Sequence, residues 1–268
     1  MLHPRVSVSA MCTFPWPFVE DLALWDRLGV RQVGLLASKV EAYGVDDAIE
    51  ALRQRGMRAT TVIGGGFHLA DPDSWAGSRA SVLRAIDLAA EVGGCTYVTT
   101  GRRDRRSFDE LCAAFADAIA PCVEHARSRG VALALEPSLR TEHSFVHSLR
   151  DGLDVVDRAG MAIVADIGNC WMERDVEATV RRAGERIAIV QLSDVVIGTP
   201  TEPAPGGRVV PGDGDLAIDR FVQAALDGGY TGAFEIELVG PRIEAEGYAA
   251  ATRRAVARTS ELLARVLG

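Results

Sequence analysis

Residues 131–169 read VALALEPSLRTEHSFVHSLRDGLDVVDRAGMAIVADIGN, with a short apolar run on either side of an amphipathic stretch. The two runs, at 132–136 and 162–166, have the length and apolar composition of β-strands, and residues 149–159 have the apolar spacing of a helix. Gly160 stands between that helix and the second strand, where glycine supplies the left-handed conformation that ends many helices. The stretch therefore predicts a strand, a crossover helix and a second strand parallel to the first.

The same alternation of short apolar runs and amphipathic stretches extends over the whole chain. Strands are predicted at residues 6–10, 32–36, 58–63, 97–100, 132–136, 162–166, 187–192 and 233–238. Helices are predicted between and after them, among others at residues 45–55, 74–92, 108–129, 149–159, 175–183, 218–227 and 248–266. Eight such units favour closure into an α/β fold of the (β/α)₈ TIM-barrel type over an open doubly wound sheet. No Gly-x-Gly-x-x-Gly turn follows the first strand, which weakens the dinucleotide-binding alternative.

Length and composition agree with a single barrel domain over residues 1–268. The chain has 268 residues and a net charge of −8, and its five cysteines show no Cys-x-x-Cys spacing. An acidic chain opposes a nucleic-acid partner, and the cysteine pattern opposes both a disulfide framework and a thiolate zinc site. The basic run at residues 102–106 is read as a solvated loop, with phosphate recognition as the alternative. Without an apolar run of about 20 residues or a signal-peptide pattern, we expect a cytoplasmic protein with no membrane partner, and homo-oligomerisation is left open.

Polar side chains close four of the otherwise apolar strands. They are Glu136, Asp166, Gln191 and Glu237. Because active sites of such barrels lie at the carboxyl ends of the strands, and because alternation turns every second residue to the axis, we expect all four to face the barrel mouth. Carboxylates gathered there repel one another unless a cation or protons compensate, which favours a bound divalent ion. The alternative is a set of ordinary strand-end residues that contact water or a nearby arginine.

These strand ends also carry a family resemblance. The motifs are Leu135-Glu136-Pro137, Asp166-x-Gly-Asn169, Gln191-Leu-Ser-Asp194, the loop that begins at Arg208, and Gly229-Tyr-Thr-Gly-x-x-x-x-Glu237. Together they resemble the sugar phosphate isomerase/epimerase superfamily, whose members have the xylose isomerase-like TIM barrel. That superfamily includes ketose 3-epimerases, hydroxypyruvate isomerase, inosose dehydratase and dehydroshikimate dehydratase. The resemblance covers essentially the whole chain and is densest over residues 133–240.

The resemblance implies a divalent metal held by Glu136, Asp166, Gln191 and Glu237. Gln191 departs from the family, which usually has histidine at that place, and Asn169 also stands where a histidine is often found. With the amide oxygen of Gln191 the ligand set is all oxygen, which suits Mn²⁺ or Mg²⁺ better than Zn²⁺. Loss of the metal is the alternative that Gln191 leaves open.

The resemblance further implies an isomerase or epimerase that acts on a small sugar, keto-sugar or related polyhydroxy carbonyl compound through an enediolate. Glu136 and Glu237 would be the catalytic proton-transfer pair. His68, Asn169 and Arg208 are the candidate substrate ligands, although His68 can equally be a plain loop histidine. Two alternatives stay open: a dehydratase or lyase on a keto-sugar, cyclitol or keto-glycoside, and a non-catalytic binding protein or partner subunit derived from such an enzyme. A nuclease of the endonuclease IV type is disfavoured because the chain has only five histidines.

Overall fold

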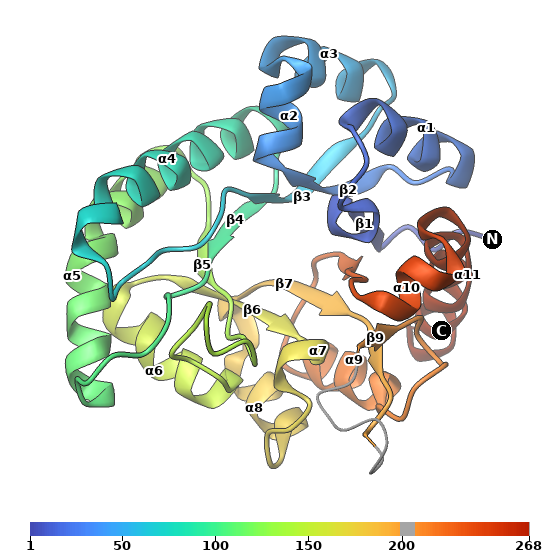
Figure 1. Ribbon diagram of the computed structural model, residues 1–268. Helices are drawn as coiled ribbons and strands as arrows, with labels where there is room; N and C mark the ends of the chain where they lie inside the picture. Colours follow the sequence, from blue (N-terminus) through green and yellow to red (C-terminus); the bar gives the residue numbers. More distant parts are fainter. Residues whose placement is uncertain (199–206, 268) are drawn as a thin grey trace.

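The computed structural model describes residues 1–198 and 207–267. In these residues, eight parallel strands close into a barrel in the order β1-β10-β7-β6-β5-β4-β3-β2, and helices surround it (Figure 1). The barrel strands are β1 (Val6–Ser9), β2 (Gln32–Leu36), β3 (Arg58–Ile63), β4 (Cys95–Val98), β5 (Leu133–Leu135), β6 (Ala162–Asp166), β7 (Ile187–Leu192) and β10 (Phe234–Ile236). The predicted (β/α)₈ barrel is confirmed.

Most of the helices connect successive strands on the outside of the barrel, and α10 and α11 follow the last strand. They are α1 (Phe18–Leu28), α2 (Ala37–Tyr43), α3 (Val45–Gln54), α4 (Trp75–Val92), α5 (Phe108–Ser128), α6 (Leu149–Ala159), α7 (Ile167–Cys170), α8 (Val176–Ala183), α9 (Ile218–Asp227), α10 (Pro241–Glu246) and α11 (Tyr248–Leu267), with 3₁₀ turns η1 (Ala10–Thr13), η2 (Pro72–Ser74) and η3 (Gly184–Arg186). Helix α6 shows the expected local signals: the Ser148 side chain caps its first turn, and Gly160 ends it at a left-handed φ of 68°. No helix in the described part of the chain is long and apolar enough to cross a membrane.

Strands β1, β5 and β10 are shorter than predicted, by one to three residues each, and two further differences bear on the site. Strand β4 begins at Cys95 rather than at residue 97, because Cys95 and Thr96 are buried and pair with Thr61 and Val62 of β3. A two-stranded antiparallel sheet of β8 (Asp194–Val195) and β9 (Arg208–Val209) was not predicted. This sheet lies at the barrel mouth beyond β7, and it places Arg208 there.

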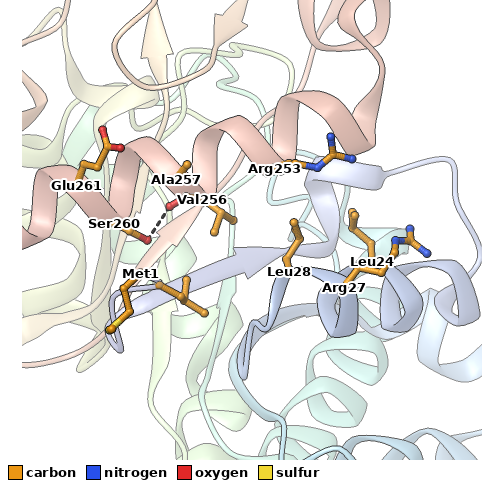
Figure 2. Close-up of a pocket in the computed structure, with 10 residues that line it drawn as sticks. Met1, Leu24, Arg27, Leu28, Arg253, Val256, Ala257, Ser260 and Glu261 are labelled. Carbon is orange, nitrogen blue, oxygen red and sulfur yellow. Dashed lines mark hydrogen bonds between the residues drawn. The ribbon is translucent and has the colours of Figure 1, made fainter.

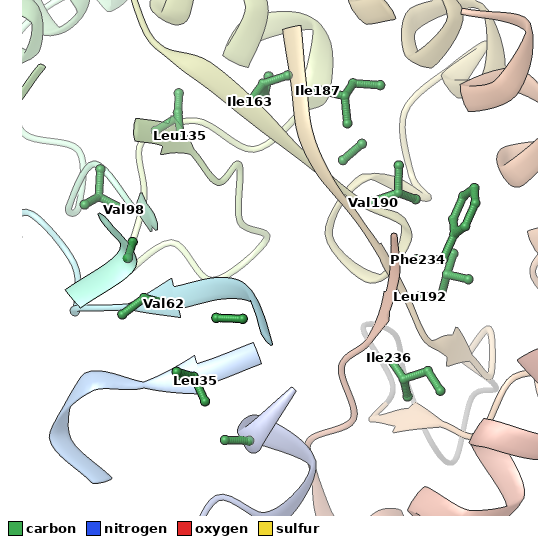
Figure 3. Packing of buried hydrophobic residues seen from close by; sticks show 14 of the residues in the cluster. Leu35, Val62, Val98, Leu135, Ile163, Ile187, Val190, Leu192, Phe234 and Ile236 are labelled. Carbon is green, nitrogen blue, oxygen red and sulfur yellow. The ribbon is translucent and has the colours of Figure 1, made fainter. Parts of the chain in front are cut away.

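The strands divide their side chains between two apolar layers. Residues such as Val98, Leu135, Ile163 and Val190 face the helices (Figure 3). The alternate residues form a separate cluster, which consists of Cys95, Tyr97, Ala134, Val164, Ile189 and Ala233. This second cluster fills the barrel interior, so the residues that follow in the same alternation also point inward.

All five cysteines are buried free thiols. Burial raises the pKa of Cys12 and of Cys95 to about 12, because the thiolate cannot be solvated there. We expect the native protein at pH 8 to show no reaction with Ellman's reagent over minutes, and five thiols to react after unfolding in guanidinium chloride. A thiol that reacts rapidly in the native protein would contradict the buried positions.

Candidate metal and substrate site

Three carboxylates converge at the carboxyl end of the barrel. Oxygen atoms of Glu136, Asp166 and Glu237 all lie within 4.8 Å of one another. Asp166 ends β6, while Glu136 and Glu237 each follow the last residue of a strand. Their backbone amides continue the ladder, since Glu136 N donates to Val98 O at 2.9 Å and Glu237 N donates to Leu192 O at 3.1 Å. The strand alternation therefore persists to these residues and turns them inward, as predicted.

Gln191 joins this cluster from β7 and is fully buried. Its Nε2 donates to Glu235 Oε1 at 3.0 Å, to Tyr97 Oη at 3.1 Å and to Glu237 Oε1 at 3.2 Å. Its Oε1 finds no hydrogen-bond donor among the described residues. A buried oxygen without a partner costs about 1–3 kcal/mol, so an electron-pair acceptor at this point would stabilise it.

The residues present fit a hard divalent cation. They offer carboxylate oxygens from Glu136, Asp166 and Glu237 and the free amide oxygen of Gln191, and every donor is oxygen. Oxygen donors of this kind suit Mg²⁺ or Mn²⁺. A site of this composition has no nitrogen or sulfur ligand that would favour Zn²⁺.

Arg208 supplies positive charge to the same carboxylates. Its Nη2 lies 2.6 Å from Asp166 Oδ2, and its Nη1 lies 2.8 Å from Glu237 Oε2. Gly168 makes room for the guanidinium, because a Cβ at that residue would lie 3.0 Å from Arg208 Nε. Burial lowers the pKa of the Arg208 guanidinium, but the negative charges of Asp166, Glu237 and Glu136 have the larger effect, so the pKa is raised. The guanidinium thus stays charged inside the site.

Asn169 and Tyr97 complete the polar floor. Asn169 Nδ2 donates to Asp166 Oδ2 at 2.7 Å and to Glu136 Oε1 at 3.2 Å, so it bridges two carboxylates. Tyr97 Oη donates to Glu237 Oε1 at 3.1 Å, and burial holds its pKa well above the usual value, so that it remains a neutral donor. Tyr97 is not among the residues predicted for the site. The signal for it is the alternation of Cys95 and Tyr97 on the inward face of β4, which begins two residues before the predicted strand.

Burial and like charge favour the protonated form of Glu136 and Glu237 when no cation compensates them. Burial, followed by the charges of Glu237 and Asp166, raises the pKa of Glu136 well above its usual value. Burial also raises the pKa of Glu237, although Arg208 opposes the rise. An upward shift of the pKa is the change by which enzymes adapt a carboxylate to proton transfer.

A cavity of about 560 Å³ opens above these residues. Its polar floor is formed by Glu136, Asn169, Arg208 and Glu237, together with Tyr97. Its walls include the apolar residues Met11, Phe14, Leu36, Ile63, Val98 and Val239 together with Tyr248, and the polar residues Thr99, Ser138, Arg140, His143 and Glu244. The cavity therefore combines apolar surface with convergent polar groups, which is typical of sites for small molecules.

Further depressions lie away from the carboxylates. His68 lines one of them with Asp71, Arg102 and Glu142, and it is not among the residues that line the 560 Å³ cavity. The neighbouring Phe67 is fully buried and packs against Phe115, so the loop turns His68 outward. The structure therefore does not bring His68 to the site, and its role as a substrate ligand stays a prediction.

A second depression, of about 630 Å³, lies between α1 and α11 beside Met1 (Figure 2). The residues drawn there include Leu28 and Val256, two arginines, Arg27 and Arg253, and one acid, Glu261. It gathers neither several carboxylates nor a histidine, and so it offers no comparable chemistry.

Asp194, the last residue of the Gln191-Leu-Ser-Asp194 motif, organises a loop. Its carboxylate accepts hydrogen bonds from the backbone amides of Gly212, Gly214 and Leu216, at 2.9 to 3.1 Å. These bonds fix the segment that follows β9, and β9 carries Arg208. The motif therefore contributes one residue to the carboxylate cluster and another that supports its arginine.

Comparison with known proteins agrees with this architecture. Residues 22–259 match the model of the xylose isomerase-like TIM barrel family, and the chain therefore belongs to that family. No curated protein matches the chain.

Several solved structures share the fold over nearly their whole length. Protein SMc04130 from Sinorhizobium meliloti 1021 is 24% identical, with a TM-score of 0.80 over 98% of both chains. The IolI protein with a bound zinc atom is 16% identical, with a TM-score of 0.86 over 98% of this chain and 99% of that one. D-psicose 3-epimerase, solved in the presence of D-fructose, is 16% identical, with a TM-score of 0.78 over 98% of this chain and 100% of that one. At these identities the likeness shows the fold alone. The predicted xylose isomerase-like TIM-barrel family is confirmed by the family match over residues 22–259.

Proposed function

We propose that this protein is a metal-dependent isomerase or epimerase of a small sugar, keto-sugar or related polyhydroxy carbonyl compound. The observation that carries the proposal is the convergence of three carboxylates within 4.8 Å beside a buried amide oxygen that has no donor in the described residues. Sugar epimerases among the proteins of the same fold, such as D-psicose 3-epimerase and L-ribulose 3-epimerase, support it by analogy.

Glu136, Asp166, Gln191 and Glu237 would hold the cation, with Mn²⁺ or Mg²⁺ the best match to their oxygen atoms. When bound, such a cation polarises the substrate carbonyl and lowers the cost of the negative charge that develops when the adjacent C–H proton leaves. Asn169 and Arg208 line the floor of the cavity and would donate hydrogen bonds to substrate hydroxyl or carbonyl oxygens.

Glu136 and Glu237 would move the proton. Glu136 keeps partial exposure toward the cavity, and among the described residues only the side chain of Asn169 donates a hydrogen bond to it. Both oxygens of Glu237 accept hydrogen bonds, one from Tyr97 and the other from Arg208. We therefore assign proton removal to Glu136 and proton return to Glu237. Return to the same carbon from the opposite face gives epimerisation, and return to the neighbouring carbon gives isomerisation.

The test is deuterium wash-in from D₂O, followed by mass spectrometry, with Mn²⁺-loaded protein and a panel of ketoses, inososes and keto-glycosides. We expect a gain of one mass unit at a carbon next to the carbonyl for at least one compound, and none with the Glu136→Gln/Glu237→Gln double variant. An unsaturated product instead of exchange would identify a lyase. Absence of both from the whole panel, with no Mn²⁺ bound, would leave a non-catalytic binding protein.

A change of Gln191 to histidine should alter the metal preference. An imidazole nitrogen favours later transition ions over hard oxygen-seeking ones, so Gln191→His should tighten Co²⁺ and Zn²⁺ binding by roughly tenfold or more relative to Mg²⁺. Isothermal titration with each ion measures the ratio, and Gln223→His on the exposed surface of α9 is the control. An unchanged ratio would mean that residue 191 does not contact the ion.

A further inference from the structure

We propose that Glu235 is a positioning residue for Gln191. From inside the barrel it holds the NH₂ end of the Gln191 amide, and it thereby leaves the amide oxygen free for the cation. The inference rests on the proposed function in one respect, namely that the ligand of that oxygen is a divalent cation.

Glu235 lies deep in the barrel, one strand period before Glu237. It pairs with Gln191 of β7 on one side and with Ser7 of β1 on the other. Its side chain is fully buried, and Gln191 Nε2 donates to its Oε1 at 3.0 Å. A carboxylate in such a place is costly unless several donors satisfy it. An apolar side chain would avoid this cost, so we infer that the carboxylate of Glu235 has a specific role.

Strand β3 supplies those donors through an irregularity. The register of β3 against β2 shifts, since Val33 pairs with Ala59 and Gly34 pairs with Thr61, which leaves Thr60 extra. In a regular strand Thr60 and Thr61 would point to opposite faces, but here both hydroxyls reach Glu235 Oε2, at 2.7 and 2.9 Å. The bulge therefore serves to gather two donors on one carboxylate.

Strand β2 provides the space. A Cβ at Gly34 would lie 2.5 Å from Glu235 Oε2 and 2.7 Å from Thr61 Oγ1, so any larger residue would displace the carboxylate. Two strands thus accommodate the buried Glu235 of β10: β2 leaves space for it at Gly34, and the bulge in β3 supplies hydroxyl donors.

These contacts determine how the side-chain amide of Gln191 is oriented. Thr60 and Thr61 occupy Oε2 of Glu235, and its Oε1 is the acceptor for Gln191, so the NH₂ group of Gln191 faces Glu235. With Nε2 committed to Glu235, Glu237 and Tyr97, Oε1 is the atom without a donor in the described residues. Metal-binding histidines are oriented in the same way by a carboxylate behind them, and here the principle applies to an amide.

The first test is a double-mutant cycle on Mn²⁺ affinity, measured by titration with electron paramagnetic resonance. Glu235→Leu should weaken Mn²⁺ binding by about 10-fold to 100-fold, the usual cost of losing such a support. Glu235→Gln, which keeps an acceptor oxygen, should restore the affinity to within about threefold. In a Gln191→Leu background, Glu235→Leu should have no further effect, because the amide that it orients is gone. Glu235→Met replaces the leucine variant if the latter does not fold.

The second test needs no metal. The side-chain NH₂ resonances of Gln191, assigned by their loss in Gln191→Leu, should shift and exchange faster with solvent in Glu235→Leu than in the wild type. Additive effects in the Mn²⁺ cycle, or unchanged Gln191 resonances, would overturn the role of Glu235 while leaving the proposed function in place. Wild-type protein that binds no Mn²⁺ would overturn the metal-dependent function and the cation part of this inference. The resonances would then decide whether Glu235 orients the amide.

Discussion

Replacing Glu136 or Glu237 with glutamine should lower turnover at least about 100-fold, because the variant keeps the volume and an amide oxygen but loses the group that carries the proton. The two variants should differ in stability. Burial and the negative charges of Glu237 and Asp166 disfavour the ionised form of Glu136, so its pKa lies well above the usual value. Glu136→Gln should therefore raise the melting temperature of the metal-free protein at pH 7.5. Glu237→Gln should gain less, because it also removes the 2.8 Å ion pair with Arg208.

Solvent-deuterium exchange into the substrate measures the first effect, and differential scanning fluorimetry measures the second. Glu185→Gln is the control: this glutamate is exposed in η3 at the opposite end of β7, and we expect wild-type turnover. Wild-type exchange rates in both active-site variants would show that other groups transfer the proton.

Replacing Arg208 with methionine should strongly destabilise the metal-free protein. The side chains of Arg208, Asp166 and Glu237 are only 12%, 1% and 7% exposed, so water cannot replace the lost charge. Removal of one partner from a buried ion pair costs roughly 3–5 kcal/mol, which corresponds to a fall in melting temperature of about 10 °C for a chain of this size. Saturating Mn²⁺ should recover much of the loss, because a bound cation stabilises the folded state and supplies positive charge.

The deficit of Arg208→Met should also depend on pH. Burial already raises the pKa values of Glu136 and Glu237, so the folded state takes up protons at a higher pH than the unfolded chain. A carboxyl group whose pKa is higher in the folded state than in the unfolded chain makes the folded protein less stable as pH rises between those two pKa values. The loss of stability caused by Arg208→Met should therefore be smaller at pH 5 than at pH 8. Arg186→Met is the control, since its pair with Asp157 is 36% and 59% exposed and should contribute at most about 1 kcal/mol. Equal melting curves for Arg208→Met and the wild type would contradict the ion pairs.

The convergence of the strand ends could be predicted because it depends on local rules. Alternation along 132–136 turns Glu136 to the side of Ala134, and the same count places Asp166 with Val164 and Gln191 with Ile189. Parallel strands present their carboxyl ends at one edge of a barrel, so four inward residues at those ends must approach one another. Their roles as ligands and bases stay predictions that the experiments above address.

Other features depend on contacts that the sequence does not reveal. The bulge that turns both Thr60 and Thr61 to Glu235 arises from the register of β3 against β2, and neither strand signals it alone. The loop after β3 turns His68 away from the cavity because Phe67 takes the buried position against Phe115 of α5, and that contact joins segments far apart in the chain.

By itself, the sequence determined the barrel, its eight parallel strands and the four polar residues that close β5, β6, β7 and β10, because periodicity and strand ends are properties of consecutive residues. Only the tertiary structure decided that Arg208 lies between Asp166 and Glu237, that Tyr97 reaches Glu237 and that Glu235 holds the amide of Gln191. These contacts join residues that are 29 to 140 positions apart in the chain. The pairing of β7 with β10 sets Gln191 beside Glu235, and the small β8–β9 sheet places Arg208. Tyr97 of β4 reaches Glu237, which follows β10, because the closed barrel brings these distant strands together.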